Sequence, residues 1–275
     1  MATMDSVTPT PLPKLSRWPG AIMKIAMVCS IIALILLATA GPGYRMGVVP
    51  LIAALLSTAL GFLLFIVAFI SGAIAWVTAR RTARPIPRGA TALVILAGVV
   101  SVFGVAFILR ARDAPPIHEI TTDFTDPPAF KDVLALRIAT GAQNPPDYHR
   151  LQNNRGVEFD VAAAQRSAFP DILPIDASET PATVLPLAEK AARQMGWTIV
   201  AVAPGDGRIE ATDTTRYFGF KDDIVVRVRP VATGSRIDVR SESRIGLGDA
   251  GTNAHRVSKY LSTLRDMTAG ASNPH

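Results

Sequence analysis

Three long apolar runs in the N-terminal part limit what this chain can fold into. They cover residues 21–40, 48–77 and 90–109, and the only charged side chain within them is Lys24. A helix of about 20 apolar residues crosses the roughly 30 Å hydrocarbon core of a bilayer. A lysine near the end of such a helix can extend to the headgroups. The sequence therefore predicts a membrane domain, residues 21–110, of three transmembrane α-helices.

The composition agrees with a membrane location. Of the 275 residues, 49% are hydrophobic and 18% are charged, which is too apolar for an ordinary soluble protein of this size. The formal net charge is +6, but several basic residues flank the apolar runs, where orientation in the membrane accounts for them. We therefore expect the lipid bilayer as a partner and no binding of nucleic acid. Cys29 is the only cysteine, so an intrachain disulfide is excluded.

The first apolar run has a second interpretation, as a signal peptide. It follows the basic residues Lys14 and Arg17 and ends in Ala38-Thr39-Ala40, a pattern found at cleavage sites. A retained helix is favoured, because the run is long for the core of a signal peptide and a second span follows directly. Whether the segment is cleaved is left open by the sequence.

The distribution of basic residues predicts the orientation of the spans. Cytoplasmic loops are enriched in Lys and Arg, so we expect residues 1–20 to be a flexible cytoplasmic tail and the chain after the third span to be exported. In a bacterium, this means the inner (cytoplasmic) membrane with a periplasmic or extracellular C-terminal domain. The residues on the expected cytoplasmic side are Lys14, Arg17, Arg80, Arg81, Arg84 and Arg88, against Arg45, Arg110 and Arg112 on the other side.

Residues 111–267 have the pattern of an extracytoplasmic α+β domain. Apolar and polar residues alternate in the stretches 224–229 and 236–240, which is typical of strands with one buried face. A turn at residues 230–235 joins them into an antiparallel hairpin. We expect the polar face of this hairpin to be wet. It would carry Arg227, Arg229, Arg236, Arg240 and Arg244, partly balanced by Asp238 and Glu242.

Further strands and helices complete the predicted domain. Thr180 and Pro181 mark the start of a helix that Gly196 ends, and a last helix begins near Asp249. The order of elements predicts an antiparallel sheet of about four strands with helices packed on one face. We expect the proline-rich residues 111–156 to wrap this domain. The remaining residues, 268–275, form a flexible tail.

Motifs of catalysis and of cofactor binding are missing from the sequence. No nucleophile elbow G-x-S-x-G occurs, and no His or carboxylate cluster has metal-ligand spacing. Asp222 and Asp223 are adjacent on a strand, so they point to opposite faces and are poorly placed as an acid and base pair. We interpret them as part of a solvated turn. The sequence thus predicts no enzyme, no metal and no cofactor.

One group of polar residues has the composition of an anion site. Arginine and hydroxyl groups near a helix N-terminus can hold a phosphate or a lipid headgroup. Ser241 and Ser243 are in register with apolar positions of the strand, so we expect them on the inward face. A structural role is the alternative, since serines often tie a helix terminus to a sheet. The candidate residues are Arg240, Ser241, Ser243, Arg244, Asp249, Asn253 and Arg256.

Four stretches also carry a resemblance to a known family. They are PPIHEITTDFTDPPAF from Pro115, AFPDILPI from Ala168, RIEATDTTRYFGFKDDIVVRVRP from Arg208 and RSESRIGLGDAGTNAHRV from Arg240. Over this C-terminal region the chain resembles the bacterial family named domain of unknown function 1499. The resemblance implies a small domain that often follows membrane spans, and it implies no reaction.

These observations predict an integral membrane protein with an exported, non-enzymatic domain. That domain is expected to bind a partner protein or another component of the cell envelope. The alternative is an anion or lipid-headgroup binding module that uses the seven candidate residues.

Overall fold

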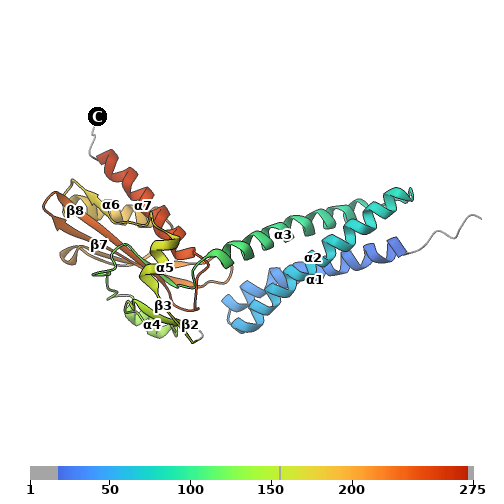
Figure 1. The fold of residues 1–275 in the computed structure, drawn as a ribbon, viewed down its shortest axis with the longest axis horizontal. Helices are drawn as coiled ribbons and strands as arrows, with labels where there is room; N and C mark the ends of the chain where they lie inside the picture. Colours follow the sequence, from blue (N-terminus) through green and yellow to red (C-terminus); the bar gives the residue numbers. More distant parts are fainter. Residues whose placement is uncertain (1–17, 155, 272–275) are drawn as a thin grey trace, which may run out of the picture. The chain divides into compact units, whose positions relative to one another are not determined.

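The computed structural model describes residues 18–154 and 156–271, and Figure 1 shows its elements. The chain divides into two compact units, Met1–Ala106 and Phe107–His275. Of the two tails predicted to be flexible, residues 1–17 and 272–275 lie outside the described residues, whereas residues 268–271 belong to the last helix. A helix already begins at Trp18.

The first unit consists of helices that match the three predicted spans. They are α1 (Trp18–Arg45), α2 (Leu51–Arg81) and α3 (Arg88–Asp113), the last of which continues into the second unit. All three are long and apolar enough to cross a membrane. Helices α1 and α3 run beyond both ends of their predicted spans, because helices continue into the polar flanks of a hydrophobic segment. Helix α2 begins three residues later than predicted, after Pro50, and ends four residues later.

The end of α1 differs from the prediction. The first span is predicted to end at residue 40, but the helix continues through Pro42 to Arg45. Gly47 ends it with a φ of +73°, a left-handed conformation that glycine adopts without strain. Its N–H bonds the carbonyl of Tyr44, and the N–H of Val48 bonds that of Gly43. This is a Schellman motif, which satisfies the last carbonyls of the helix.

Small residues allow the three helices to pack closely. Gly72 on α2 faces Val94 of α3 and Ala26 of α1, with no room for a Cβ atom. Gly61 lies similarly close to Leu37 of α1. Both glycines thus let the helices of one chain approach closely, as small residues do in membrane helices.

The second unit contains a six-stranded antiparallel sheet. Its order is β1-β8-β7-β6-β5, and the short strand β4 also pairs with β8. The β7–β8 hairpin is longer than predicted, because pairing continues to Val231 and Gly234 and leaves a two-residue turn. The strands are β1 (Glu119–Thr121), β4 (Ile175–Ala177), β5 (Thr198–Ala203), β6 (Arg208–Thr214), β7 (Lys221–Val231) and β8 (Gly234–Ser243).

Four helices and a separate hairpin accompany this sheet. Helix α6 begins at Pro181 and Gly196 follows its end, as the sequence predicts. The last helix runs through Ala271, past its expected end. The bounds are α4 (Leu134–Ala139), α5 (Val161–Ala168), α6 (Pro181–Gln194), α7 (Thr252–Ala271), the 3₁₀ turn η1 (Pro204–Asp206) and the hairpin β2 (Leu151–Asn154) with β3 (Val157–Asp160).

Helices α6 and α7 cover one face of the sheet (Figure 1). The alternate residues of β7 and β8 that were predicted to be buried form this core with side chains from both helices. The ring of Trp197 stacks on that of Tyr260 with centroids 4.9 Å apart. The hydroxyl of Tyr260 donates to the carbonyl of Ala188 on α6 at 3.0 Å, so the buried polar atom is satisfied.

Most of the opposite face of the sheet is covered, which corrects the prediction of a wet face for Arg227, Arg240 and Arg244. The side chains of Arg229 and Arg236 remain 37% and 36% exposed. The segment of residues 122–149 covers most of this face, and Phe130 and Val133 pack on Val225 of β7. Arg240 is 1% exposed and its guanidinium lies 4.9 Å from the ring centre of Phe130. The segment was expected to wrap the domain, but its apolar residues gave no sign of which face it covers.

Candidate functional site

The seven candidate residues are divided between the two faces of the sheet. Successive side chains of a strand point to opposite faces. Ser241 and Ser243 face α7, as predicted, and are bonded to Asn253 of that helix. Arg240 and Arg244 lie on the other face, against the covering segment. The sheet therefore separates the two arginines from the rest of the expected cluster.

On the helix side, Asn253 joins three segments of the chain. Its Nδ2 donates to the carbonyl of His118 and to the Oγ of Ser243, both at 2.9 Å. Its Oδ1 accepts a hydrogen bond from Ser241 at 2.6 Å. Asp249 accepts from the N–H groups of Gly251 and Asn253, and burial raises the pKa of this carboxyl despite them. The N-terminus of α7 is thus fixed to β8 by neutral hydrogen bonds.

Arg256 completes this cluster as the ion partner of two carboxylates. Its Nε donates to Asp213 at 2.8 Å and its Nη2 to Asp222 at 2.5 Å. Nη1 is directed at Ser241 and Asn253. Burial acts to lower the pKa of Arg256, but the two aspartates outweigh it and the pKa is raised. The guanidinium is saturated by internal acceptors.

On the opposite face, Arg244 makes a bidentate pair with Asp223. The two contacts are 2.8 and 2.7 Å, and Arg244 also reaches Thr140 and Thr212. Asp222 and Asp223 do point to opposite faces, as predicted. The prediction that they form part of a solvated turn is wrong, however, because both carboxylates are buried in ion pairs.

Arg137 is a member of this network that sequence reasoning missed. It lies on α4 with its guanidinium directed inward, and it bonds Asp223 at 2.9 Å and Glu242 at 3.1 Å. Its neighbour Ile138 is 82% exposed, the reverse of the usual burial. An arginine within the short apolar run LALRIA was the only local signal.

Arg240 links the network to the edge of the sheet. It pairs with Glu119 of β1 at 2.8 Å and with Glu242 at 3.1 Å. Burial raises the pKa of both carboxyls, that of Glu242 to about 8, although the nearby arginines act in the other direction. Gln152 of β2 donates to Glu119 at 2.7 Å and brings the network to the wall of a pocket.

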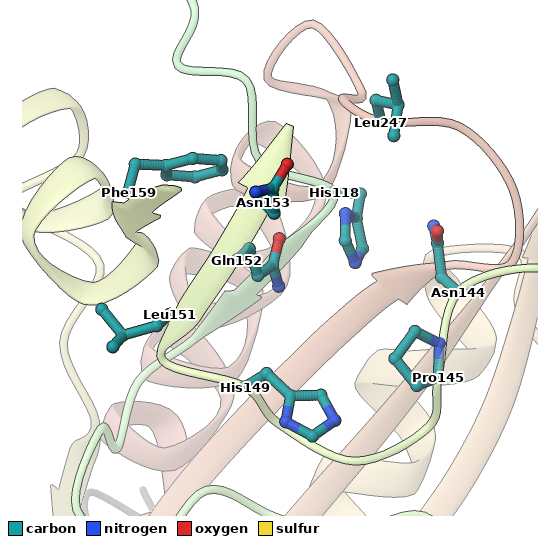
Figure 2. Close-up of a pocket in the computed structure, with 9 residues that line it drawn as sticks. All are labelled: His118, Asn144, Pro145, His149, Leu151, Gln152, Asn153, Phe159 and Leu247. Carbon is teal, nitrogen blue, oxygen red and sulfur yellow. The ribbon is translucent and has the colours of Figure 1, made fainter. Parts of the chain in front are cut away.

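This pocket has a volume of about 260 Å³ and lies beside the start of β1. Figure 2 shows Gln152 extending from β2 toward the ring of His118, with Asn144 and Pro145 on the facing loop. Leu247 lies at the rim. The lining residues are His118, Asn144, Pro145, His149, Leu151, Gln152, Asn153, Phe159 and Leu247.

His118 is the most perturbed group of the pocket. Burial lowers its pKa to about 4, and the positive charges of Arg240 and Arg137 act in the same direction. The imidazole is therefore neutral at physiological pH, when it offers one donor and one acceptor.

The described residues contain no candidate metal site. Their histidine, cysteine and acidic side chains form no group of three or more that could hold a metal ion.

Comparison with known proteins bears on the family alone. No curated protein matches the chain. A family model described as "Protein of unknown function (DUF1499)" matches residues 119–264, more than half of the chain. The match begins at β1 and ends within α7, so it covers the sheet, both clusters and every lining residue of the pocket except His118. It confirms the resemblance that the sequence carries, and the chain belongs to the DUF1499 family of proteins of unknown function.

Proposed function

We propose that this protein is a membrane-anchored binding module of the bacterial envelope. In this proposal the three helices lie in the inner membrane with the N-terminus in the cytoplasm. The C-terminal domain is exported and binds an envelope component without catalysing a reaction. The pocket beside β1 is the binding site.

The orientation is supported by the connections between the helices. The connection between α2 and α3 and its flanks carry Arg80, Arg81, Arg84 and Arg88, whereas that between α1 and α2 is flanked by Arg45 alone. This bias favours a cytoplasmic α2–α3 connection. Lys14 and Arg17, which support the same orientation, lie outside the described residues.

The binding proposal rests on one difference: the arginines of the ionic clusters are already paired with internal carboxylates, whereas the pocket is lined by polar groups that face open space. The guanidiniums of Arg240, Arg244 and Arg256 are engaged by internal carboxylates and buried. An anion would have to displace these partners, so we propose that the seven candidate residues have a structural role. The imidazole of His118, by contrast, is only half-buried and faces the pocket.

Reporter fusions test the orientation. Alkaline phosphatase fused after His275 is expected to be active in a bacterial host, and green fluorescent protein at the same position to be dark. The opposite pair of results would overturn export of the domain and, with it, an envelope ligand.

Site-directed photo-crosslinking in living cells tests the binding site. A photo-crosslinking side chain is introduced in place of Leu247 at the pocket rim, and in a second variant in place of Leu173. The two positions are matched, being 51% and 57% exposed, and only Leu247 lines the pocket. We expect adducts, resolved by mass spectrometry, at position 247 and few at 173. Equal yields at both positions would contradict binding at the pocket.

A further inference from the structure

The polar groups that line the pocket are suited to a hydroxylated ligand. Among the described lining residues, none is a carboxylate, a lysine or an arginine. Three side-chain amides, Asn144, Gln152 and Asn153, stand with two imidazoles, His118 and His149. Amides and neutral imidazoles each combine donors with acceptors. Asn144 uses its amide hydrogens on the carbonyls of Ser243 and Gly246 and offers its oxygen as an acceptor. Gln152 gives one hydrogen bond to Glu119, and Asn153 accepts one from the N–H of Gly156, so each keeps further donor or acceptor capacity. A hydroxyl group both donates and accepts, so it can be matched to the capacity that remains.

The ion pair of Glu119 and Arg240 lies behind the pocket wall, and Arg150, between the lining residues His149 and Leu151, pairs with Asp160 at the surface. Glu119 is bound by Arg240 at 2.8 Å and by Gln152 at 2.7 Å, and both charged side chains are 1% exposed. A fully charged ligand would lose its hydration on entering and would find no free counter-ion. The cost of such a transfer is large unless the charge is paired. The surroundings therefore favour an uncharged ligand.

His118 also disfavours an anion. A protonated imidazole would supply a positive charge, but the pKa of His118 is lowered to about 4 by burial, Arg240 and Arg137. The imidazole thus stays neutral between pH 5 and pH 8. It contributes hydrogen bonds over this whole range and contributes no charge.

The remaining wall is apolar and the space is small. Pro145, Leu151, Phe159 and Leu247 supply this part of the lining, and Leu247 is half exposed at the rim. Pockets for small molecules usually enclose roughly 300–1,000 Å³, whereas this one has about 260 Å³. One small ring with a hydroxylated edge and an apolar face fits this volume. Its hydroxylated edge would meet the amides and imidazoles, and its apolar face would meet the apolar wall.

We propose that the pocket binds a single uncharged sugar residue, such as the end of a glycan. Its hydroxyl groups bond the amides and the imidazole of His118, and its C–H face lies on the apolar wall. This inference rests on the proposed binding function, because it names the ligand class of the same site.

Ligand-observed NMR on the full-length protein in phosphatidylcholine nanodiscs tests this assignment. Saturation transfer is measured to glucose and N-acetylglucosamine, and to two charged counterparts of glucose, glucuronate and glucose 6-phosphate. We expect transfer to at least one neutral sugar and weaker transfer to both charged ones. Preferential binding of the charged sugars would overturn the inference.

Two variants locate the signal. Leu247→Arg places a charge at the rim and is expected to weaken sugar binding by about tenfold, which corresponds to roughly 1.4 kcal/mol. Leu173→Arg is the matched control and should bind like the parent protein. Equal binding by both variants would place the sugar elsewhere and refute the inference.

The outcomes separate this inference from the proposed function. Specific adducts at position 247 without sugar binding would leave a binding module and refute the ligand class. Loss of both signals would refute both proposals.

Discussion

Arg244 and Asp223 form a two-point ion pair in which the arginine side chain is 4% exposed and the aspartate side chain is inaccessible. The pair connects β8 to β7 on the face that residues 122–149 cover. Buried pairs of this kind are weak evidence for net stabilisation, but removing one partner leaves an uncompensated charge. The network around them therefore decides how the domain tolerates mutation.

We expect Arg244→Ala to lower the free energy of unfolding by about 3 kcal/mol, the low end for breaking a buried ion pair. Asp223 loses its two-point partner in a dry site but keeps Arg137 at 2.9 Å. Pulse proteolysis of the full-length protein in detergent, over a urea series, measures the change. Arg193→Ala is the control, since Arg193 pairs with Glu189 on the surface of α6. It should change the value by about 0.5 kcal/mol or less. Similar losses in both variants would contradict a buried structural pair.

Tyr260→Phe tests the contact between α6 and α7. The substitution keeps the ring that stacks on Trp197 and removes the hydroxyl that donates to Ala188. The expected loss is about 1 kcal/mol, the net value of one hydrogen bond. Tyr260→Ala should cost about 3–5 kcal/mol, because it also leaves a cavity. If the two variants unfold at the same urea concentration, the ring contributes little and the packing argument fails.

Glu242 predicts how the stability of the domain changes with pH. Burial raises its pKa from 4.5 to about 8, against the attraction of Arg240 and Arg137. The folded state therefore favours the protonated carboxyl. This contribution is complete below pH 4.5 and is lost as the pH rises through 8. Glu119 and Asp249, whose pKa values are also raised by burial, act in the same direction.

His118 has the opposite effect at lower pH, because its pKa falls from 6.5 to about 4 on folding. Above pH 6.5 the contribution of His118 to the free energy of unfolding is constant, because the imidazole is neutral in both the folded and the unfolded state. Between pH 6.5 and 8 we expect stability to fall by at most about 1.4 kcal/mol per pH unit for one titrating group. Glu242→Gln should flatten this slope, whereas Glu158→Gln on the exposed strand β3 should keep it. Parallel slopes in both variants would exclude Glu242 as the source.

Gly72→Leu is expected to destabilise the helical unit. A Cβ atom at Gly72 would collide with Val94 of α3, so the helices must separate or repack. Gly89→Leu is the control, because nothing lies within 4 Å of a Cβ there. The loss of monodisperse protein on heating in detergent reports the difference. Gly89→Leu should match or exceed the parent protein, since leucine favours a helix over glycine. Equal melting of both variants would show that close packing at Gly72 is dispensable.

Much of the architecture could be predicted from local patterns. The three spans followed from apolar length, and the β7–β8 hairpin from alternation. Helix α6 followed from its Pro181 start and Gly196 stop. The inward direction of Ser241 and Ser243 followed from their register with apolar neighbours. Each of these inferences uses residues close together in the sequence, where backbone periodicity fixes the direction of side chains.

The burial of the arginine-rich face could not be predicted in the same way. Alternation identifies two faces of a strand but does not say what covers the polar one. The partner of Asp223 on α4 is Arg137, 86 residues earlier in the chain. The covering segment has no strand-like alternation, so its position depends on contacts between distant residues, both ion pairs and the packing of Phe130 and Val133 on Val225. The pocket was missed for the same reason, since His118 and Leu247 meet only in the folded domain.

The pairing of β1 with β8 also sets the order in which the domain can assemble. Glu119 of β1 lies opposite Glu242 of β8, so the first strand to be synthesised pairs with the last. Contacts between such distant residues form slowly, because a long loop must close first. Until the ribosome has made β8, Glu119 has no arginine and β1 has no neighbour. The nascent domain therefore cannot complete its sheet before β8 is synthesised. A chain truncated before Arg240 is expected to be degraded rather than to fold.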